Sequence, residues 1–453
     1  MLECAIMHPI CEQRMHAPPT PMRFEDFPWV LNLPSGAPAE GDLSPLERRG
    51  LLQRSVAWNG ELLLTARPTC RPPGREGMMP TPASVYRLSR FTLIRREGAR
   101  IIVESPAAWA RAIVHDRALM PLLHDLGEAV PGTELARLCA QLPERIVRAV
   151  VALLHHAGLV CHAREEPCDD EKGSTAAPPR ASFDEDTAPG PAQWAFHDLL
   201  FHGRTRYGNN LEPLGKTYPF RARLDPPPAL RPHSGVPRLC LPRPDLAQLV
   251  EHDPPFAAVV EARRSVRRPG RVALPLSALG ELLFRTMRVR ELSSPTAERA
   301  YEFSDRPHPS AGACHPLETY LAVDRCEGLE PGLFRYLPRE HALEPVCGSE
   351  GGVDRLLVDA AHATGVAERP QVLMVLAARF ARVSWAYGPL SYSLILKEVG
   401  VVFQSVYLAA TAMGLGACAL GVGNSRVFAE LVGVDPLVET SVGEILLGSM
   451  PAH

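Results

Sequence analysis

The chain reads YSLILKEVGVVFQSVYLAATAMG from Tyr392 to Gly414, and LGACALGVGN follows directly from Leu415 to Asn424. The first stretch is apolar almost throughout, so we expect a long helix over 392–413 that is buried on nearly all sides, in a large core or a subunit interface. In the second stretch, closely spaced glycines let the backbone approach a phosphate or the edge of a planar ring. Because these glycines follow a helix and not a strand, they do not form a Rossmann dinucleotide site.

Helix and strand signals alternate on both sides of this helix. The pattern predicts helices at 276–288 and 352–365 and strands at 319–323, 372–377 and 444–448. The C-terminal half therefore belongs to the α+β or α/β class and not to the helical bundles.

A cluster of cations opens this half of the chain, in the segment Glu261-Ala-Arg-Arg-Ser-Val-Arg-Arg268. Arginines hold a phosphate by charge-assisted, often bidentate, hydrogen bonds, and a nearby serine can donate another. A solvated basic helix face would carry the same residues, so the segment alone leaves both interpretations open.

A third motif is the loop Arg306-Pro-His-Pro-Ser-Ala-Gly-Ala-Cys-His-Pro-Leu-Glu318. Proline, serine and glycine at this density predict an irregular backbone whose free N–H and C=O groups can meet a planar polar ligand. An ordinary surface loop is the alternative for each of these residues taken singly.

The N-terminal half divides into three parts by composition. Residues 1–82 are rich in proline and we expect irregular order there; residues 83–165 carry periodic patterns; residues 166–192 are an acidic linker rich in Pro, Ser, Thr and Ala. The C-terminal domain then occupies 193–453.

Within 83–165 the sequence predicts a hairpin, four helices and a returning strand. The hairpin pairs 91–94 with 99–103 through a turn at Glu97-Gly98. The helices are expected at 106–114, 117–126, 133–141 and 143–156, and the strand at 159–161. This order resembles a winged helix-turn-helix.

Composition excludes several classes of function. The 453 residues carry a net charge of −3, and the candidate recognition helix 144–156 has only Arg145 and Arg148, so we expect no nucleic-acid partner. The eleven cysteines show no zinc-finger spacing, and we expect reduced thiols, no metal site and a cytoplasmic protein. We find neither a secretory signal nor an apolar run of about 18 residues, so we expect no membrane association.

Together the three motifs, in this order, resemble the nitroreductase-like flavoproteins, and more narrowly the SagB/ThcOx-type azoline dehydrogenases. The resemblance spans about 194–450 and implies a nitroreductase-like fold that holds FMN in a homodimer. It implies three groups of cofactor-binding residues: Arg263, Ser265 and Arg267 would grip FMN, Pro309, Ser310, Ala311 and Gly312 would line its ring, and Leu420, Gly421 and Gly423 would complete the site.

The same resemblance implies that the chain oxidises thiazoline or oxazoline rings to azoles in a ribosomally made, modified peptide. Partners would be the precursor peptide and a YcaO-type cyclodehydratase. The winged-helix-like domain would bind the leader of the precursor, which could add to it as an extra strand.

One position departs from the family, which places a Lys-Tyr pair after a tryptophan. This chain reads Ser384-Trp-Ala-Tyr387, so Ala386 stands where the lysine is expected. Our hypothesis is that Tyr387 still takes part in catalysis, with Lys397 or Arg382 as its helper. The competing hypotheses are that Tyr387 only packs under the flavin, or that another oxidation has replaced azoline oxidation.

Two other functions stay open. One is a general nitro- or quinone-reductase that uses NAD(P)H, although such enzymes usually lack a long N-terminal region. The other is a flavin-free subunit that docks the leader peptide.

Overall fold

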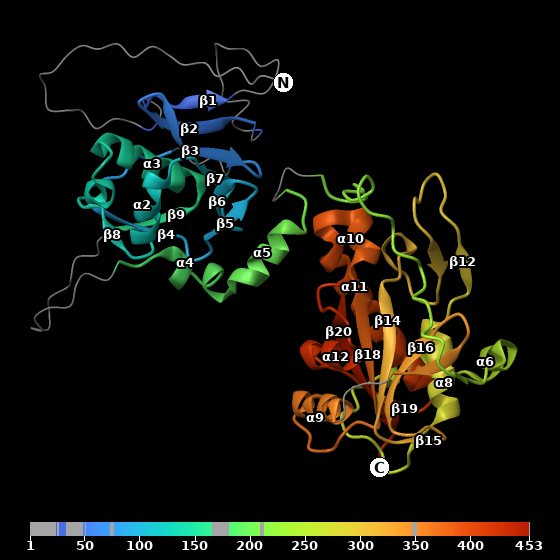
Figure 1. Cartoon of the computed structure of the whole chain (residues 1–453). Helices are drawn as coiled ribbons and strands as arrows, with labels where there is room; N and C mark the ends of the chain where they lie inside the picture. The colour runs from blue at the N-terminus through green and yellow to red at the C-terminus, as the bar shows by residue number, and fades with distance from the viewer. Residues whose placement is uncertain are drawn as a thin grey trace, which may run out of the picture. The chain divides into compact units, whose positions relative to one another are not determined.

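The computed structural model describes residues 24, 27–32, 49, 51–72, 77–164, 181–208, 213–346 and 351–452. The chain forms two compact units, 1–213 and 214–453 (Figure 1). The division falls after the expected domain start at 193, because helix α5 (Phe196–Arg204) belongs to the first unit. There Arg204 forms an ion pair with the buried Glu104.

The first unit contains two antiparallel sheets. The larger has the strand order β1-β2-β3-β7-β6-β5 and the smaller has the order β8-β4-β9. The strands are β1 Val30–Asn32, β2 Gln53–Trp58, β3 Glu61–Pro68, β4 Ser84–Leu88, β5 Leu93–Glu97, β6 Arg100–Glu104, β7 Ala110–Val114, β8 Val130–Pro131 and β9 Val160–Arg164. The helices besides α5 are α2 Met120–Asp125, α3 Glu144–Ala157 and α4 Asp184–Thr187, with 3₁₀ turns η1 Arg117–Leu119, η2 Leu135–Cys139 and η3 Pro191–Gln193.

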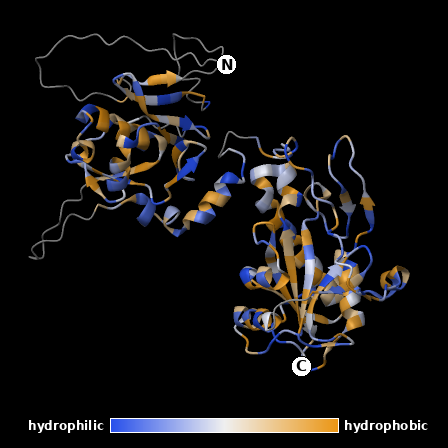
Figure 2. Ribbon diagram, in the orientation of Figure 1, coloured by the Kyte–Doolittle hydropathy of each residue, from blue (hydrophilic) through white to orange (hydrophobic). Residues whose placement is uncertain are grey.

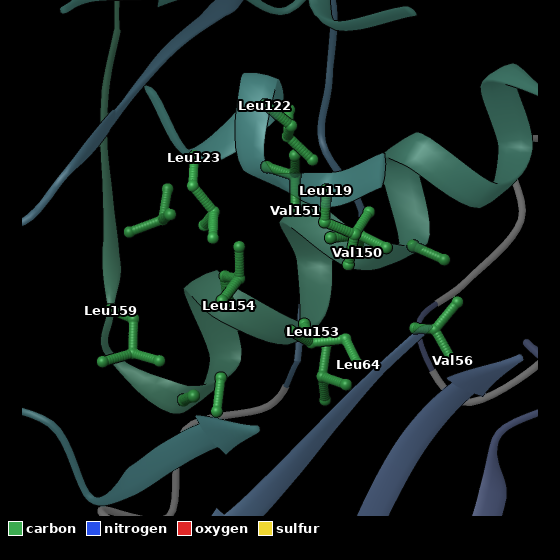
Figure 3. Packing of buried hydrophobic residues seen from close by; sticks show 14 of the residues in the cluster. Val56, Leu64, Leu119, Leu122, Leu123, Val150, Val151, Leu153, Leu154 and Leu159 are labelled. Carbon is green, nitrogen blue, oxygen red and sulfur yellow. The ribbon is translucent and has the colours of Figure 1, made fainter. Parts of the chain in front are cut away.

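Helix α3 forms the centre of this unit (Figure 3). Its apolar residues from Ile146 to Ala157 are buried, and they contact strands of both sheets. The helix ends at Gly158, whose left-handed conformation (φ 84°) lets its N–H bond back to the last turn. Because α3 is buried between strands, it does not present an exposed recognition face.

The expectations for this unit are met in part. The hairpin is confirmed, with Glu97 paired to Arg100, and so are the helix at 143–156 and the returning strand. The helix expected at 106–114 is wrong: 110–114 is strand β7, which pairs with β3 and β6. The winged-helix interpretation is not confirmed, since the larger sheet extends into 53–68, where we expected irregular order.

The expected linker 166–192 lies mostly outside the described residues. Its last part, from 181 onward, packs on the first unit through the buried carboxylate of Glu185. This carboxylate accepts hydrogen bonds from the Ser89 hydroxyl (2.7 Å) and the Arg90 backbone N–H (2.8 Å).

The second unit is built on a seven-stranded antiparallel sheet in the order β10-β17-β16-β14-β18-β20-β19. These strands are β10 Leu239–Cys240, β14 Leu317–Val323, β16 Gly332–Leu337, β17 Ala342–Pro345, β18 Val372–Arg379, β19 Leu415–Ala419 and β20 Glu439–Ser449. Two short pairs, β11 Leu274–Pro275 with β15 Cys326–Glu327 and β12 Glu291–Ser293 with β13 Phe303–Asp305, lie outside it. The helices are α6 Leu246–His252, α7 Phe256–Ala262, α8 Leu276–Met287, α9 Gly352–Thr364, α10 Ala381–Tyr387, α11 Ser391–Ala412 and α12 Ser425–Val432, with η4 Ala311–Ala313 and η5 Gly388–Leu390.

Both faces of this sheet are covered, so most residues of its central strands are buried and apolar (Figure 2). In β18 alternate residues serve opposite cores: Met374 packs with α8 and α11, and Val375 packs with α9 and α12. The helices and strands predicted at 276–288, 352–365, 319–323, 372–377, 392–413 and 444–448 are all confirmed within a few residues.

Helix α11 is the long apolar helix of the sequence, but it is not buried on nearly all sides within one chain. Its residues Val399, Val402 and Val406 face the core, while Tyr392 and Leu396 are exposed. We expected no segment long and apolar enough to cross a membrane, but the stretch 381–412 is, by length and composition. Within its 18-residue apolar window, 33% is buried inside the protein. Core helices meet the same criterion, and α11 packs against the sheet and α8.

Candidate functional site

The loop 309–312 meets Tyr387 at Gly312. Gly312 has a left-handed backbone (φ 60°), and a Cβ there would lie 2.5 Å from the hydroxyl oxygen of Tyr301 and 2.6 Å from that of Tyr387. A side chain at this position is therefore excluded on both conformational and steric grounds. The structure thus brings together the loop expected to line a planar ligand and the tyrosine expected to act on it.

A lysine that the sequence analysis did not select lies beside this tyrosine. The Nζ atom of Lys216 is 6.0 Å from the centroid of the Tyr387 ring and 5.6 Å from that of Tyr301. Its segment is held against α10 by a hydrogen bond of 3.0 Å from the Tyr218 N–H to the Ala386 carbonyl. A lysine side chain therefore lies beside the tyrosine that follows Ala386.

Tyr387 is half-buried at the end of α10, and burial raises the pKa of its hydroxyl to about 12. At neutral pH only about one molecule in 10⁵ would carry a phenolate with this pKa. The hydroxyl is consequently suited to donating a hydrogen bond, and less suited to accepting a proton from a substrate.

The two helpers expected from the sequence lie differently. Lys397 is an exposed residue of α11, and no interaction between it and Tyr387 is found among the described residues; its role as a helper of Tyr387 is untested. Arg382 is buried, and its guanidinium donates to the carbonyls of Pro227, Glu302 and Cys314. Through these hydrogen bonds Arg382 connects α10 to the loops around it.

The basic segment 263–267 follows α7 and packs against α11 and β19. The Ser265 hydroxyl lies 3.0 Å from that of Tyr407, and the Arg263 guanidinium lies over the Tyr407 ring at 5.4 Å. Arg263 and Arg267 form no ion pair with any described carboxylate. A cleft of about 620 Å³ opens here, lined by residues including Arg264, Ser265, Arg267 and Arg268.

The segment 420–423 begins where β19 ends and is joined to the basic segment through Tyr407. The Tyr407 hydroxyl accepts a hydrogen bond of 2.7 Å from the Ala419 N–H. Gly421 is exposed, with open space where a Cβ would stand, so a ligand can approach its backbone. Gly423 is required for another reason, since a Cβ there would collide with the buried carboxylate of Glu444.

Helix α11 connects all three segments. Tyr407 contacts the first and third, and Glu398 accepts a hydrogen bond of 2.5 Å from Ser310 of the second. Tyr407 lies nine positions after Glu398, or about 13.5 Å along the helix. The loop has its own cleft, of about 460 Å³, and within the described residues no hydrogen bond or ion pair joins it directly to the other segments.

These features fit FMN. Arg267, which forms no ion pair with a described carboxylate, and the Ser265 hydroxyl line an open cleft and suit its phosphate. The glycine of the 309–312 loop and the exposed backbone of Gly421 suit its planar ring. The placement of Arg263, Ser265, Arg267, Pro309, Ser310, Ala311, Gly312, Leu420, Gly421 and Gly423 is compatible with their expected roles, which stay predictions.

Comparison with known proteins decides the family. The family model "Nitroreductase family" matches residues 260–449. A protein of Methanocaldococcus jannaschii named as a nitroreductase, MJ1384, is 32% identical over 202 residues, which cover 44% of this chain and 93% of that protein. The chain belongs to the nitroreductase family. A second family model, "Cyanobactin oxidase ThcOx", matches residues 86–210, in the unit that precedes the nitroreductase domain.

Two further relatives are peptide-processing proteins by name. The microcin B17-processing protein McbC of Escherichia coli is 30% identical over 116 residues, and the trifolitoxin-processing protein TfxB of Rhizobium leguminosarum bv. trifolii is 25% identical over 148. The matches cover 24% and 32% of this chain, and 42% and 40% of the relatives, so the chain matches less than half of either. A structure of the E. coli microcin synthetase McbBCD complex with truncated pro-MccB17 matches 56% of this nitroreductase-family chain and 92% of the other chain, at 19% identity and a TM-score of 0.35.

Lys216 could have been found from the sequence by counting. Lysine occurs three times in the chain, at 172, 216 and 397, so 45 of the 48 basic residues are arginine. Residue 172 lies outside the described residues. In a chain that uses arginine so consistently, each lysine is a candidate for a role that arginine cannot fill.

Proposed function

We propose that the chain is an FMN-dependent dehydrogenase that oxidises azoline rings to azoles in a ribosomally synthesised, modified peptide. The observation that supports this most is the meeting of Lys216, Tyr387 and Gly312 in a nitroreductase-family unit. The ThcOx match over 86–210 and the names of McbC and TfxB, both peptide-processing proteins, support a peptide as the substrate.

FMN would be held by the residues of the three segments. Arg263, Ser265 and Arg267 would bind its phosphate, and the backbones at 309–312 and 420–423 would contact its ring system. When bound, it supplies the acceptor for the hydride that leaves the azoline ring.

The chain's own residues would move the proton. Aromatising an azoline removes one hydrogen as hydride and the acidic hydrogen next to the carbonyl as a proton. The Lys216 amine would take that proton. The neutral Tyr387 hydroxyl would donate a hydrogen bond to the substrate and increase the acidity of the ring C–H.

The enzyme would work as a homodimer. On α11 the residues Tyr392, Leu396, Gly400 and Gln404 are exposed at a spacing of four, which places them on one stripe of the helix. Such a stripe on an otherwise apolar helix is suited to an interface. A second copy could then bring its 309–312 loop to the basic cleft of the first, which would account for two separate clefts on one chain.

The first unit would bind the leader of the precursor peptide. Strand β5 is an edge of the six-stranded sheet, and an extended peptide can add to such an edge by main-chain hydrogen bonds. The azoline substrate would come from a YcaO-type cyclodehydratase partner. Both proteins would act in the cytoplasm, where disulfides are rare, and the described cysteines are free thiols.

A mass-spectrometric assay tests this function. The full chain, supplied with FMN and a peptide already cyclised to azolines, should remove two hydrogen atoms per ring. The similarity to MJ1384 favours a second candidate, a reductase of small nitro compounds or quinones. Oxidation of NAD(P)H by such compounds, with no change in the cyclised peptide, would favour that candidate over ours.

A further inference from the structure

Three buried side chains direct their ligand atoms at one another next to the 309–312 loop. They are His308 and His315, at the two ends of this loop, and Glu398 of α11; each is at most 4% exposed. The Nε2 atom of His308 lies 3.3 Å from Nδ1 of His315. Glu398 Oε1 lies 3.6 Å from the first nitrogen and 3.7 Å from the second.

The hydrogen bonds around the cluster leave lone pairs at its centre. His308 Nδ1 lies 3.0 Å from the Thr286 carbonyl, which can only accept, so in the neutral ring Nδ1 carries the proton and Nε2 the lone pair. Glu398 Oε2 accepts from the Ser310 hydroxyl, whereas Oε1 has no hydrogen-bond partner among the described residues. A buried carboxylate oxygen without a hydrogen-bond partner is costly unless a positive group lies beside it.

We propose that His308, His315 and Glu398 bind a divalent transition-metal ion, with zinc the best fit. The point in the plane of the three atoms that is equidistant from them lies about 2.0 Å from each. A metal at or slightly above this point would meet the zinc–nitrogen and zinc–oxygen distances of roughly 2.0–2.2 Å. Two imidazoles and one carboxylate suit zinc, whereas magnesium and calcium prefer oxygen ligands alone. A metal-bound histidine usually donates its other N–H to a carbonyl or carboxylate, as His308 does to Thr286.

The ion would fix the shape of the loop. Gly312, Ala313 and His315 have left-handed backbones, with φ of 60°, 57° and 43°. Such angles are costly for residues other than glycine and persist only where the surroundings hold them. A metal that joins both ends of the loop to Glu398 would supply that restraint, and it would hold Ser310 and Gly312 in place beside Tyr387. This is a positioning role, separate from the proposed chemistry.

Metal analysis of the purified full chain tests the inference. The protein is produced in zinc-supplemented medium with a tag that binds no metal, and zinc is measured by mass spectrometry of the element. We expect one zinc per chain in the wild type and a loss of at least most of it in Glu398→Gln and His315→Gln. The control is His341→Gln, because His341 is also buried and hydrogen-bonded, to Tyr336 and the Pro242 carbonyl, but lies outside the cluster.

The wild type decides the question even if the variants do not fold. X-ray absorption at the zinc edge should show only nitrogen and oxygen ligands, including imidazole, and removal of zinc by a chelator should lower Tm until zinc is restored. A folded wild type without stoichiometric metal, whose Tm does not respond to zinc chloride, would overturn the inference. A proton shared by the three side chains would then lie at the centre of the cluster. These readouts need neither peptide nor FMN, so their failure is distinct from failure of the proposed function.

Discussion

Lys216 and Tyr387 lie side by side although they come from distant parts of the sequence, with the lysine Nζ 6.0 Å from the centre of the tyrosine ring. A backbone hydrogen bond from the Tyr218 N–H to the Ala386 carbonyl joins the segment of Lys216 to the segment of Tyr387. Ala386 occupies the place where the family resemblance implies a lysine. Lys216, from another segment, therefore lies close to the residue that follows Ala386.

The first prediction separates Lys216 from Lys397. Replacing the base of a proton transfer typically costs roughly 10²–10⁴-fold in rate, so Lys216→Met should lower azole formation by about that factor. Lys397→Met, an exposed residue of α11, serves as the matched variant and should retain activity. The rates are measured by mass spectrometry with FMN saturating. The opposite ranking of the two variants would assign the proton transfer to Lys397.

The second prediction concerns Tyr387. Because burial raises the pKa of its hydroxyl to about 12, this group stays protonated across the working pH range. Tyr387→Phe should therefore lower kcat, by roughly 10-fold or more for a lost hydrogen bond to the substrate, without changing the shape of the pH–rate profile between pH 6 and about pH 10. If the profile loses a titration in this variant, Tyr387 is a base and not a donor; an unchanged kcat would leave it only a packing role.

The third prediction tests the phosphate site. A charge-assisted hydrogen bond contributes about 1.5–3 kcal/mol, so Arg267→Met should raise the Kd of FMN by roughly 10- to 100-fold. Arg355, an exposed arginine of α9, supplies the control as Arg355→Met. Flavin fluorescence titration measures both. Equal FMN affinity in the two variants would remove Arg267 from the site.

The fourth prediction concerns the carboxylate behind Gly423. Burial raises the pKa of Glu444 from 4.5 to about 7, assisted by Asp359 and opposed by hydrogen bonds from Ser441 and Asn424. Between these two pH values the folded state keeps a proton that the unfolded state has released, so stability falls as pH rises through the window, by about 3 kcal/mol in all. Glu444→Gln should remove this fall in the free energy of unfolding. Glu430 is an exposed residue of α12, so Glu430→Gln should preserve the fall.

Urea unfolding of FMN-free protein at pH 5, 6, 7 and 8 measures this effect. A free energy of unfolding that follows the same pH curve in wild type and Glu444→Gln would contradict the assignment.

The second unit could be predicted from the sequence because its elements are long and strongly periodic. Helix α11 and strand β18 are long and mainly apolar, because each packs in the core that covers the sheet. The structure confirms the predictions for both. In the first unit the error at β7 has a physical cause. Alanines in 106–114 favour a helix, but pairing with β3 and β6 outweighs that preference.

The hairpin β2–β3 has a local signal in its sequence. Asn59 and Gly60 lie between two apolar segments and both adopt positive φ, 51° and 82°, as a two-residue hairpin turn requires. The candidate site was harder to predict. The three flavin motifs could be found one by one, but the proximity of Lys216 to Tyr387 and of Glu398 to the two histidines depends on tertiary packing between distant segments.

Mass spectrometry of a cyclised precursor peptide is the most direct test of the account. The peptide, carrying its leader and at least one azoline, is incubated with the full chain and FMN under air. We predict that each ring loses two hydrogen atoms, that the loss requires FMN, and that Lys216→Met slows it far more than Lys397→Met does. A flavin-loaded, folded protein that leaves the rings unchanged would contradict the central claim.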